Sequence, residues 1–477
     1  MPALAARLSR YLPPPLDAPE ELGACGARTV FSRTERWALL AAFALILVLR
    51  LPRAWAMGRF QDEEATVFLA YAWHHDWLDA LFRPFAGYWN LGANATTLLV
   101  TRLVQGGVLP LERAPYVTMA IALAFQALPA VLILTGSGRW LAARLAVIAA
   151  LLTIAIVPAT EEVFFNVLHI QFHLALCAGL ILALDVPRRR IARIGYHALL
   201  FLAPLCGPGA IVILPLFALR ALIDRDRGRL VQCAAFAAGA AVQLLLFYGA
   251  SPLRGHLIDP ATVAAAMSVR LIALPAFGVS LAYRFGGFIY ASQLAGGAAW
   301  WAIAAATCLL FGVLLLRAFQ RRDAAIWLLL SSLGIAAASL GFGMVIVTRA
   351  SLVRVYDGER YNFLPLVLLG LALIALARRQ EMREKAVYAS LCALMLLTGA
   401  RHYPQPNPDF AEGPSWPAEV AAWRRDHRHP LAVWPRPWAA DLSDETRACS
   451  PPGKDLGQST DPRYCESGWA AGFFPRK

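Results

Sequence analysis

Long apolar runs alternate with short arginine-rich segments along most of this chain of 477 residues. A helix of about 20 apolar residues can cross the hydrocarbon core of a bilayer, and runs of that kind recur between residues 38 and 400. The pattern therefore predicts an all-α polytopic membrane protein with about 11 transmembrane helices. The expected spans are 38–56, 114–135, 140–158, 163–185, 192–206, 208–222, 230–250, 294–317, 324–347, 361–378 and 383–400.

The composition supports this class. Hydrophobic residues make up 58% of the chain and charged residues 16%, whereas soluble domains have about 45–50% and about 25%. These values exclude a disordered chain, a fibrous chain and an ordinary soluble enzyme. The net charge of +13 comes mainly from arginines in short segments between apolar runs. We therefore expect the lipid bilayer, and not nucleic acid, as a partner.

The arginines also predict the orientation. Five short loops rich in arginine fall on one side of the membrane if the N-terminus is cytoplasmic, in agreement with the positive-inside rule. The chain then divides into a cytoplasmic segment (1–37), a transmembrane domain (38–400) and an extracytoplasmic tail rich in proline and tryptophan (401–477). We expect a multi-pass protein of the inner (plasma) membrane. The five loops are 136–144, 186–193, 220–229, 317–323 and 378–385.

Two assignments carry this topology. The apolar stretch 194–222 would be about 43 Å long as one helix, so we divide it into a hairpin at Gly207-Pro208-Gly209. The stretch 91–109 contains several polar residues, so we assign it to an interfacial helix outside the membrane. A transmembrane path for 91–109 stays open as the alternative, and it would invert the loops that follow.

The predicted outer loops are much longer than the inner ones, which indicates a protein that acts at the outer surface. They are 57–113, 251–293 and 348–361. The first contains three consecutive acids, Asp62, Glu63 and Glu64, followed by an amphipathic stretch that predicts an interfacial helix. We expect this arrangement to hold the acids at the membrane surface. Acids at a solvated helix N-terminus are the alternative.

A second acidic site follows the third predicted span. Glu161 and Glu162 are expected at the outer surface, because two acids at the bilayer centre would be costly. Asn166, His169 and His173 follow at the helical spacing i, i+3 and i+7, which predicts a polar helix face lining a water-filled cavity. Hydrogen bonding between spans is the alternative.

The last outer loop contains three arginines, although the positive-inside rule disfavours arginine there. They are Arg349, Arg354 and Arg360. A guanidinium group binds phosphate through a planar fork of N–H donors, and Arg360 begins a predicted span at the depth of lipid head groups. The sequence therefore predicts a lipid-phosphate site. The alternatives are pairing of Arg360 with Asp357 or Glu359, or binding of bulk anionic lipid.

The order of these motifs resembles the GT-C class of membrane glycosyltransferases, which use polyprenyl-phosphate sugars. Asp62-Glu63-Glu64 corresponds to the acidic motif after the first span, Glu161-Glu162 to acids after the third, and Arg360-Tyr361 to a late Arg-Tyr pair. The resemblance covers about residues 38–400, mostly as architecture. It implies an inverting transfer of a sugar from a polyprenyl-phosphate donor to a glycan, lipid or protein acceptor.

The resemblance also implies roles for individual residues. Asp62 would be the catalytic base and Glu63 would orient the acceptor. Because the sequence has no clear Asp-x-Asp motif, a divalent metal as cofactor stays open. The second acidic site, on the acceptor side, would comprise Glu161, Glu162, Asn166 and His169, and the donor phosphate would be bound by Arg360, Tyr361, Arg354 and Arg349.

Two other functions remain open from the sequence. A Wzy-like polymerase or ligase of lipid-linked glycans would also use outer arginines, but would depend less on acids after the first span. A membrane transporter or flippase predicts acids buried in mid-membrane and internal repeats, and the sequence has no visible repeat. In the tail, Cys449 and Cys465 would be able to form a disulfide if they are extracytoplasmic.

Overall fold

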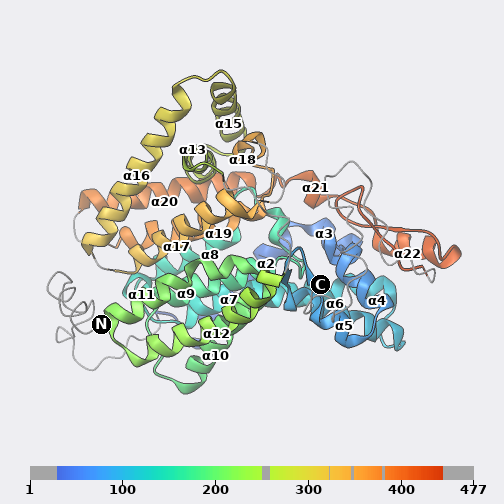
Figure 1. The fold of residues 1–477 in the computed structure, drawn as a ribbon. Helices are drawn as coiled ribbons and strands as arrows, with labels where there is room; N and C mark the ends of the chain where they lie inside the picture. Colours follow the sequence, from blue (N-terminus) through green and yellow to red (C-terminus); the bar gives the residue numbers. More distant parts are fainter. Residues whose placement is uncertain (1–29, 250–257, 322, 345–348, 379–381, 444–477) are drawn as a thin grey trace.

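The computed structural model describes residues 30–249, 258–321, 323–344, 349–378 and 382–443 (Figure 1). These residues are mostly helical, and five helices are long and apolar enough to cross a membrane. These residues therefore have the architecture of an all-α membrane protein. The five candidate spans are Leu111–Thr135, Arg227–Leu246, Pro260–Phe277, Ala299–Arg321 and Ala324–Gly343.

Four of these candidate spans coincide with predicted ones, and the fifth does not. Pro260–Phe277 lies within 251–293, where the sequence pattern predicts an outer loop. This segment contains Arg270, but that arginine is buried inside the protein and so does not prevent an apolar helix from forming. Several other predicted spans are occupied by shorter apolar helices, such as Ile170–Ala183 and Arg360–Leu376.

The N-terminal part contains short helices and one small hairpin. The stretch 91–109, predicted as an interfacial helix, forms a helix over Leu91–Gln105 that is 15 residues and about 22 Å long, and this helix is not among the candidate spans. The elements are α2 (Arg33–Arg50), α3 (Pro52–Met57), the π-helix η1 (Glu64–Leu69), α4 (Ala70–His74), α5 (Trp77–Phe82), β1 (Pro84–Phe85), β2 (Tyr88–Trp89) and α6 (Leu91–Gln105).

The central part forms one side of the helical body. Its elements are η2 (Leu111–Arg113), α7 (Ala114–Thr135), η3 (Arg139–Leu141), α8 (Arg144–Ala155), η4 (Glu161–Val163), α9 (Ile170–Ala183), α10 (Arg190–Cys206), η5 (Pro208–Ile213), α11 (Leu214–Asp224) and α12 (Arg227–Gly249). The helix breaks at Gly207, as predicted. A Cβ at Gly207 would meet the side chain of Gln171, which would then have to shift.

The last part of the helical body includes the two helices that project at the top of Figure 1, α15 and α16. Its elements are α13 (Pro260–Met267), the π-helix η6 (Ser268–Ala273), α14 (Leu274–Phe277), α15 (Val279–Leu294), α16 (Ala299–Arg321), α17 (Ala324–Ala338), the π-helix η7 (Ser339–Gly343), α18 (Arg349–Val353), α19 (Arg360–Leu376) and α20 (Met382–His402).

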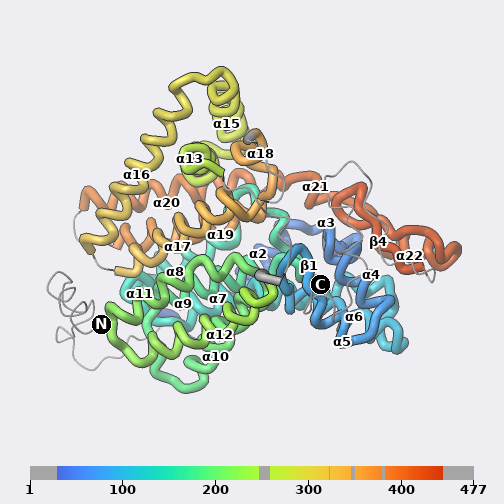
Figure 2. The backbone as a smooth tube through the Cα atoms, viewed as in Figure 1, coloured from blue at the N-terminus to red at the C-terminus, as the bar shows by residue number. Residues whose placement is uncertain are grey.

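Two short apolar helices form the centre of the core. Nearly every residue of α9 and of α19 is buried. The helix α9 packs against α7, α10, α17 and α19, and α17 lies along α19 (Figure 2). The helix α9 begins directly after the loop 158–169, and α19 begins directly after the loop 354–359. Both loops therefore lie at the edge of the buried core.

The tail packs on the N-terminal helices (Figure 1). Trp416 is buried against the ring of Phe60, and its indole nitrogen donates to the carbonyl of Leu111 at 2.8 Å. Cys449 and Cys465 lie outside the described residues, as does most of the segment 1–37. The described tail comprises α21 (Pro408–Ala411), α22 (Trp416–Arg425), β3 (Leu431–Ala432) and β4 (Ala439–Ala440).

Candidate functional site

The tail fixes the backbone that carries the first acidic motif. Trp434 pairs with the segment around Gln61 as a short parallel bridge. The main-chain nitrogen of Trp434 donates to the carbonyl of Phe60 at 3.0 Å. The main-chain nitrogen of Asp62 donates to the carbonyl of Trp434 at 2.6 Å. Asp62 has a left-handed backbone, with φ of 42°, which non-glycine residues adopt infrequently. The bridge therefore helps to hold Asp62 in an uncommon conformation just before the π-helix η1.

Gln61 joins the two acidic motifs. Its side-chain nitrogen donates to the carbonyl of Glu162 at 3.0 Å and to the carboxylate of Asp62 at 3.2 Å. Its side-chain oxygen accepts from Asn166 at 3.0 Å. Because Gln61, Glu162 and Asn166 are all buried, these bonds fix the first outer loop against the loop 158–169.

Glu162 forms an ion pair with Arg360. One carboxylate oxygen contacts the Arg360 guanidinium, and the other accepts from the Arg360 main-chain nitrogen at 2.8 Å. Burial raises the pKa of Glu162, but the Arg360 charge, the His169 ring and the hydrogen bonds from Arg360 together outweigh it and hold this pKa below its ordinary value. The partner of Arg360 is thus Glu162, and not the nearby acids Asp357 or Glu359 considered from the sequence.

Glu161 has a separate arginine partner. Its carboxylate contacts the Arg50 guanidinium at 2.6 Å and lies 3.4 Å from the His402 ring nitrogen. Its main-chain nitrogen donates to Glu359 at 3.1 Å, and Asn407 donates to the other oxygen of Glu359 at 2.8 Å. Burial raises the pKa of Glu161, but Arg50 and His402 outweigh it, so this pKa is lowered. Burial and the Glu161 charge raise the pKa of Glu359.

Arg50 and Glu359 were not among the predicted site residues. Arg50 is 2% exposed, and besides Glu161 it donates to the carbonyls of Ala155 and Val157 at 2.9 and 2.7 Å. A signal for Arg50 was present, because an arginine inside the predicted first span (38–56) is costly unless its charge is paired. Glu359 had no such signal, since its contacts come from distant segments.

Asp62 lies among other charges. It is 7% exposed, and Glu63 beside it is half-buried. Burial raises the pKa of Asp62 most, and repulsion from Glu63 and Glu162 adds to the effect, while Arg360 and Gln61 oppose it. The carboxyl of Asp62 is therefore a weaker acid than usual, within electrostatic reach of an arginine.

Glu64 serves to hold the same loops together. Its two oxygens accept from the main-chain nitrogens of Val167 and Gln61 at 3.0 and 3.1 Å. Burial raises its pKa to about 7, and those hydrogen bonds and Arg59 oppose the rise. Because both oxygens bind backbone, Glu64 acts as a link between segments.

The predicted polar helix face is wrong for two of its three residues. The helix α9 begins at Ile170, so Asn166 and His169 lie in irregular backbone before it, where Phe165 has a left-handed φ of 57°. Asn166 accepts from the His169 main-chain nitrogen at 2.9 Å, and the His169 ring contacts the carbonyl of Glu162 at 2.9 Å. These residues shape the loop around Glu162.

The remaining predicted phosphate ligands lie in different surroundings. Arg354 is exposed, and the side chain of Arg349 lies outside the described residues. The hydroxyl of Tyr361 donates to the carbonyl of Gly343 at 3.0 Å, and the Arg360 guanidinium lies 5.2 Å from the Tyr361 ring centre. Of the three arginines predicted to bind phosphate, Arg360 is thus the one that the structure places against an acid of the second acidic site.

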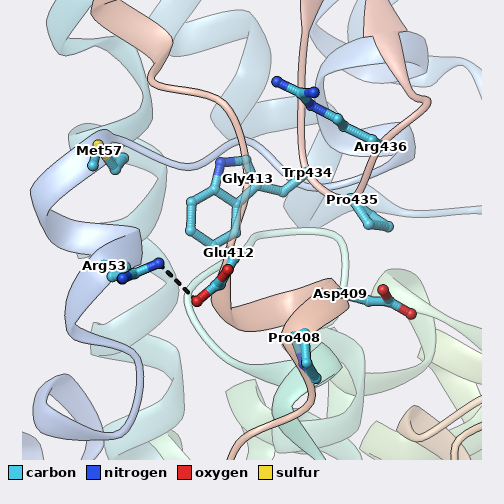
Figure 3. Close-up of a pocket in the computed structure, with 9 residues that line it drawn as sticks. All are labelled: Arg53, Met57, Pro408, Asp409, Glu412, Gly413, Trp434, Pro435 and Arg436. Atoms are coloured by element: carbon cyan, nitrogen blue, oxygen red, sulfur yellow. Dashed lines mark hydrogen bonds and ion pairs between the residues drawn. The ribbon is translucent and has the colours of Figure 1, made fainter.

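A surface cleft of about 380 Å³ lies beside this site, between α3, α21 and the Trp434 loop (Figure 3). An ion pair of Arg53 and Glu412, 2.7 Å apart, lies at the cleft, and both side chains are more than half exposed. Asp409 and Arg436 add one charge of each sign to its lining. The cleft therefore offers charged groups of both signs near the loop that carries Asp62.

A metal centre is not indicated by the described part of the chain, where no group of three or more His, Cys, Asp or Glu side chains is placed to hold an ion. Comparison with protein-family models, curated proteins and solved structures gives no match. The chemistry of the site therefore rests on its own side chains. They supply a weakly acidic carboxyl, further carboxylates and a partly exposed arginine.

Proposed function

We propose that the protein is an integral membrane glycosyltransferase that moves a sugar from a polyprenyl-phosphate donor to a hydroxyl of a glycan, lipid or protein. The observation that carries this proposal is the convergence of Asp62, Glu63 and Arg360 around Glu162. These groups come from the first and last polar loops, and the apolar helix α19 starts at Arg360. A lipid-linked anionic substrate fits a site of this kind.

The proposed reaction uses one base and one cation. The acceptor oxygen attacks the anomeric carbon from the face opposite the phosphate, a new C–O bond forms, and the bond to the phosphate oxygen breaks. Asp62 takes the acceptor proton as general base. Arg360 stabilises the negative charge that develops on the polyprenyl phosphate. The products are an inverted glycoside and free polyprenyl phosphate, with the proton on Asp62.

The state of Arg360 supports a phosphate-binding role. Its side chain is 31% exposed, whereas that of Glu162 is 4% exposed. A guanidinium has five N–H donors, so it can contact a phosphate and keep Glu162 as a partner. Glu162 then holds Arg360 in place while its exposed part meets the donor.

The proposed topology follows from the arginine pattern and the chemistry together. The N-terminal segment would be cytoplasmic, and the acids, Arg360 and the tail would face the outer side of the plasma membrane. The count of about 11 spans includes several short apolar helices such as α8 and α9. Short helices are compatible with a bilayer that the protein thins locally.

The test is release of polyprenyl phosphate by the purified protein in lipid vesicles. The wild type is offered a panel of polyprenyl-phosphate sugars with crude envelope acceptor, with and without divalent metal. We expect release from at least one donor, and loss of release in Asp62→Asn and in Arg360→Ala. Matched controls are Asp426→Asn and Arg425→Ala, which change exposed residues at the far end of α22 and should leave release unchanged.

The same assay separates the competing functions. Release that persists in Asp62→Asn would contradict a general base at that position and favour a polymerase or ligase. Movement of an intact lipid-linked sugar across the vesicle, without release, would favour a transporter or flippase. Absence of both donor binding and release from every donor would contradict the proposal as a whole.

A further inference from the structure

Arg270 is a buried arginine that the proposed mechanism does not use. It lies in the π-helix η6, within the candidate span Pro260–Phe277, and it is 1% exposed. An arginine inside such a segment is costly unless its donors are satisfied, and irregular turns of this type are frequent at functional sites. The contacts of Arg270 therefore show what its burial achieves.

The guanidinium of Arg270 donates hydrogen bonds to several carbonyls of the loop before α19. Its donors reach the main-chain carbonyls of Leu352 and Ser351 at 2.8 and 3.0 Å, and those of Arg354 and Asp357 at 2.6 and 2.7 Å. Four carbonyls from seven consecutive residues thus converge on one side chain. This loop leads directly into Arg360, so Arg270 sets the path of the chain into the phosphate-binding residue.

A fifth contact extends the link to the acidic loop. Arg270 donates to the side-chain oxygen of Asn362 at 2.7 Å, and Asn362 donates to the carbonyls of Ala159 and Val355 at 3.1 and 2.9 Å. Asn362 lies two residues after Arg360, and Ala159 lies just before Glu161. Arg270 and Asn362 together therefore tie η6, the start of α19 and the acidic loop into one unit.

From this network we infer that Arg270 is a positioning residue, which sets the place of Arg360 relative to the donor phosphate. The inference rests on the proposed function, because it assigns Arg360 to that phosphate. Since Arg270 lies on a candidate span, it also ties the phosphate site to an element that is long and apolar enough to cross a membrane. Lysine cannot reproduce the planar fork that reaches five acceptors. A shift of about 1 Å in a positioned group can cost about 100-fold.

The test is binding of polyprenyl phosphate to the full-length protein in lipid nanodiscs, with polyprenol as the ligand that lacks phosphate. We expect Arg270→Lys and Asn362→Ala to weaken polyprenyl-phosphate binding by about 10- to 100-fold and to leave polyprenol binding unchanged. Arg284→Gln, an exposed arginine on α15, should bind both ligands like the wild type. A merely structural defect would reduce the folded fraction or weaken both ligands alike.

The outcomes distinguish the inference from the function on which it rests. If the wild type shows no preference for polyprenyl phosphate over polyprenol, the proposed function fails. If the wild type has this preference and Asn362→Ala keeps it in full, the positioning role is overturned, whether or not the Arg270 variant folds. Asn362→Ala removes the link to α19 and leaves the four carbonyl contacts of Arg270 in place.

Discussion

The main-chain nitrogen of Arg360 donates to the carboxylate of Glu162 at 2.8 Å, and the Arg360 guanidinium contacts the same carboxylate. The preceding residues of the two segments make the reverse contact. There the acidic loop supplies the donor, and the main-chain nitrogen of Glu161 donates to the Glu359 carboxylate at 3.1 Å. The acidic loop and the start of α19 are therefore locked in register by two reciprocal contacts. This lock places the arginine beside the acids.

Replacing Glu162 by glutamine should weaken this lock without removing it. The amide keeps one acceptor, but the charge that holds Arg360 is lost. We expect a loss of about 2 kcal/mol in the free energy of unfolding, measured by chemical denaturation in detergent. Donor binding should weaken as well, since Arg360 would no longer be held. A variant with wild-type stability and wild-type donor binding would show that the Glu162 charge does not hold Arg360 in place.

Glu161 and Glu359 should respond differently to the same substitution at pH 7. The lowered pKa of Glu161 means that its charge stabilises the fold above about pH 4.5, and this is lost as the pH falls through the lowered pKa. Glu161→Gln leaves Arg50 buried and unpaired, so we expect a loss of about 3–5 kcal/mol in unfolding free energy.

The raised pKa of Glu359 has the opposite consequence. Folded Glu359 keeps a proton that the unfolded chain loses, so its contribution to stability falls as the pH rises above its ordinary pKa. Because burial and the Glu161 charge favour the neutral form of Glu359, Glu359→Gln should cost less than Glu161→Gln, about 1 kcal/mol, mainly from the contact with Asn407. Equal losses of unfolding free energy in the two glutamine variants at pH 7 would contradict these charge states.

The pH dependence of turnover should report the charge on Glu63. Asp62 must be ionised to act as a base, so kcat/KM should fall as the pH falls through its raised pKa. The Glu63 carboxylate contributes to that raised pKa, so Glu63→Gln should move the acidic limb to lower pH. The check is a pH profile of polyprenyl phosphate release, with the exposed Glu412→Gln as control. A limb that does not move, or moves to higher pH, would rule out Asp62 as the titrating base.

Arg50 should be essential for folding, whereas its neighbour Arg53 should not. Arg50→Met removes the arginine partner of Glu161 and the arginine donors to the carbonyls of Ala155 and Val157, and we expect a loss of about 3–5 kcal/mol in unfolding free energy. Arg53 is 63% exposed, so Arg53→Ala should change stability by less than about 1 kcal/mol. The double variant Arg50→Met with Glu161→Gln should lose less than the sum of the two single losses. Strict additivity would show that the pair is not coupled.

Sequence reasoning predicted features that depend on neighbouring residues. Hydropathy predicted α7, α12, α16 and α17, and the polar motifs predicted that Asp62, Glu162 and Arg360 belong to one site, which the structure brings together. Contacts between distant segments could not be predicted in this way. Arg50 and Glu161 are 111 residues apart, and no local pattern relates them.

The clearest differences between sequence and structure have the same origin. Arg270 reads as a charge that interrupts an apolar run, yet its donors are satisfied by a loop about 80 residues later, so a helix forms there. Asn166 and His169 have helical spacing, but their hydrogen bonds to the acidic loop hold them in irregular backbone. Spacing alone does not show whether a polar group is satisfied inside its helix or outside it.

The most direct test of the central claim is to measure donor binding and donor cleavage separately in Asp62→Asn and Arg360→Ala. A donor cleaved by the wild type is used, with both variants in vesicles and folding verified by thermal unfolding. The account predicts that Asp62→Asn binds the donor like the wild type but does not release polyprenyl phosphate, whereas Arg360→Ala loses donor binding. Normal release by Asp62→Asn, or normal donor binding by Arg360→Ala, would contradict it.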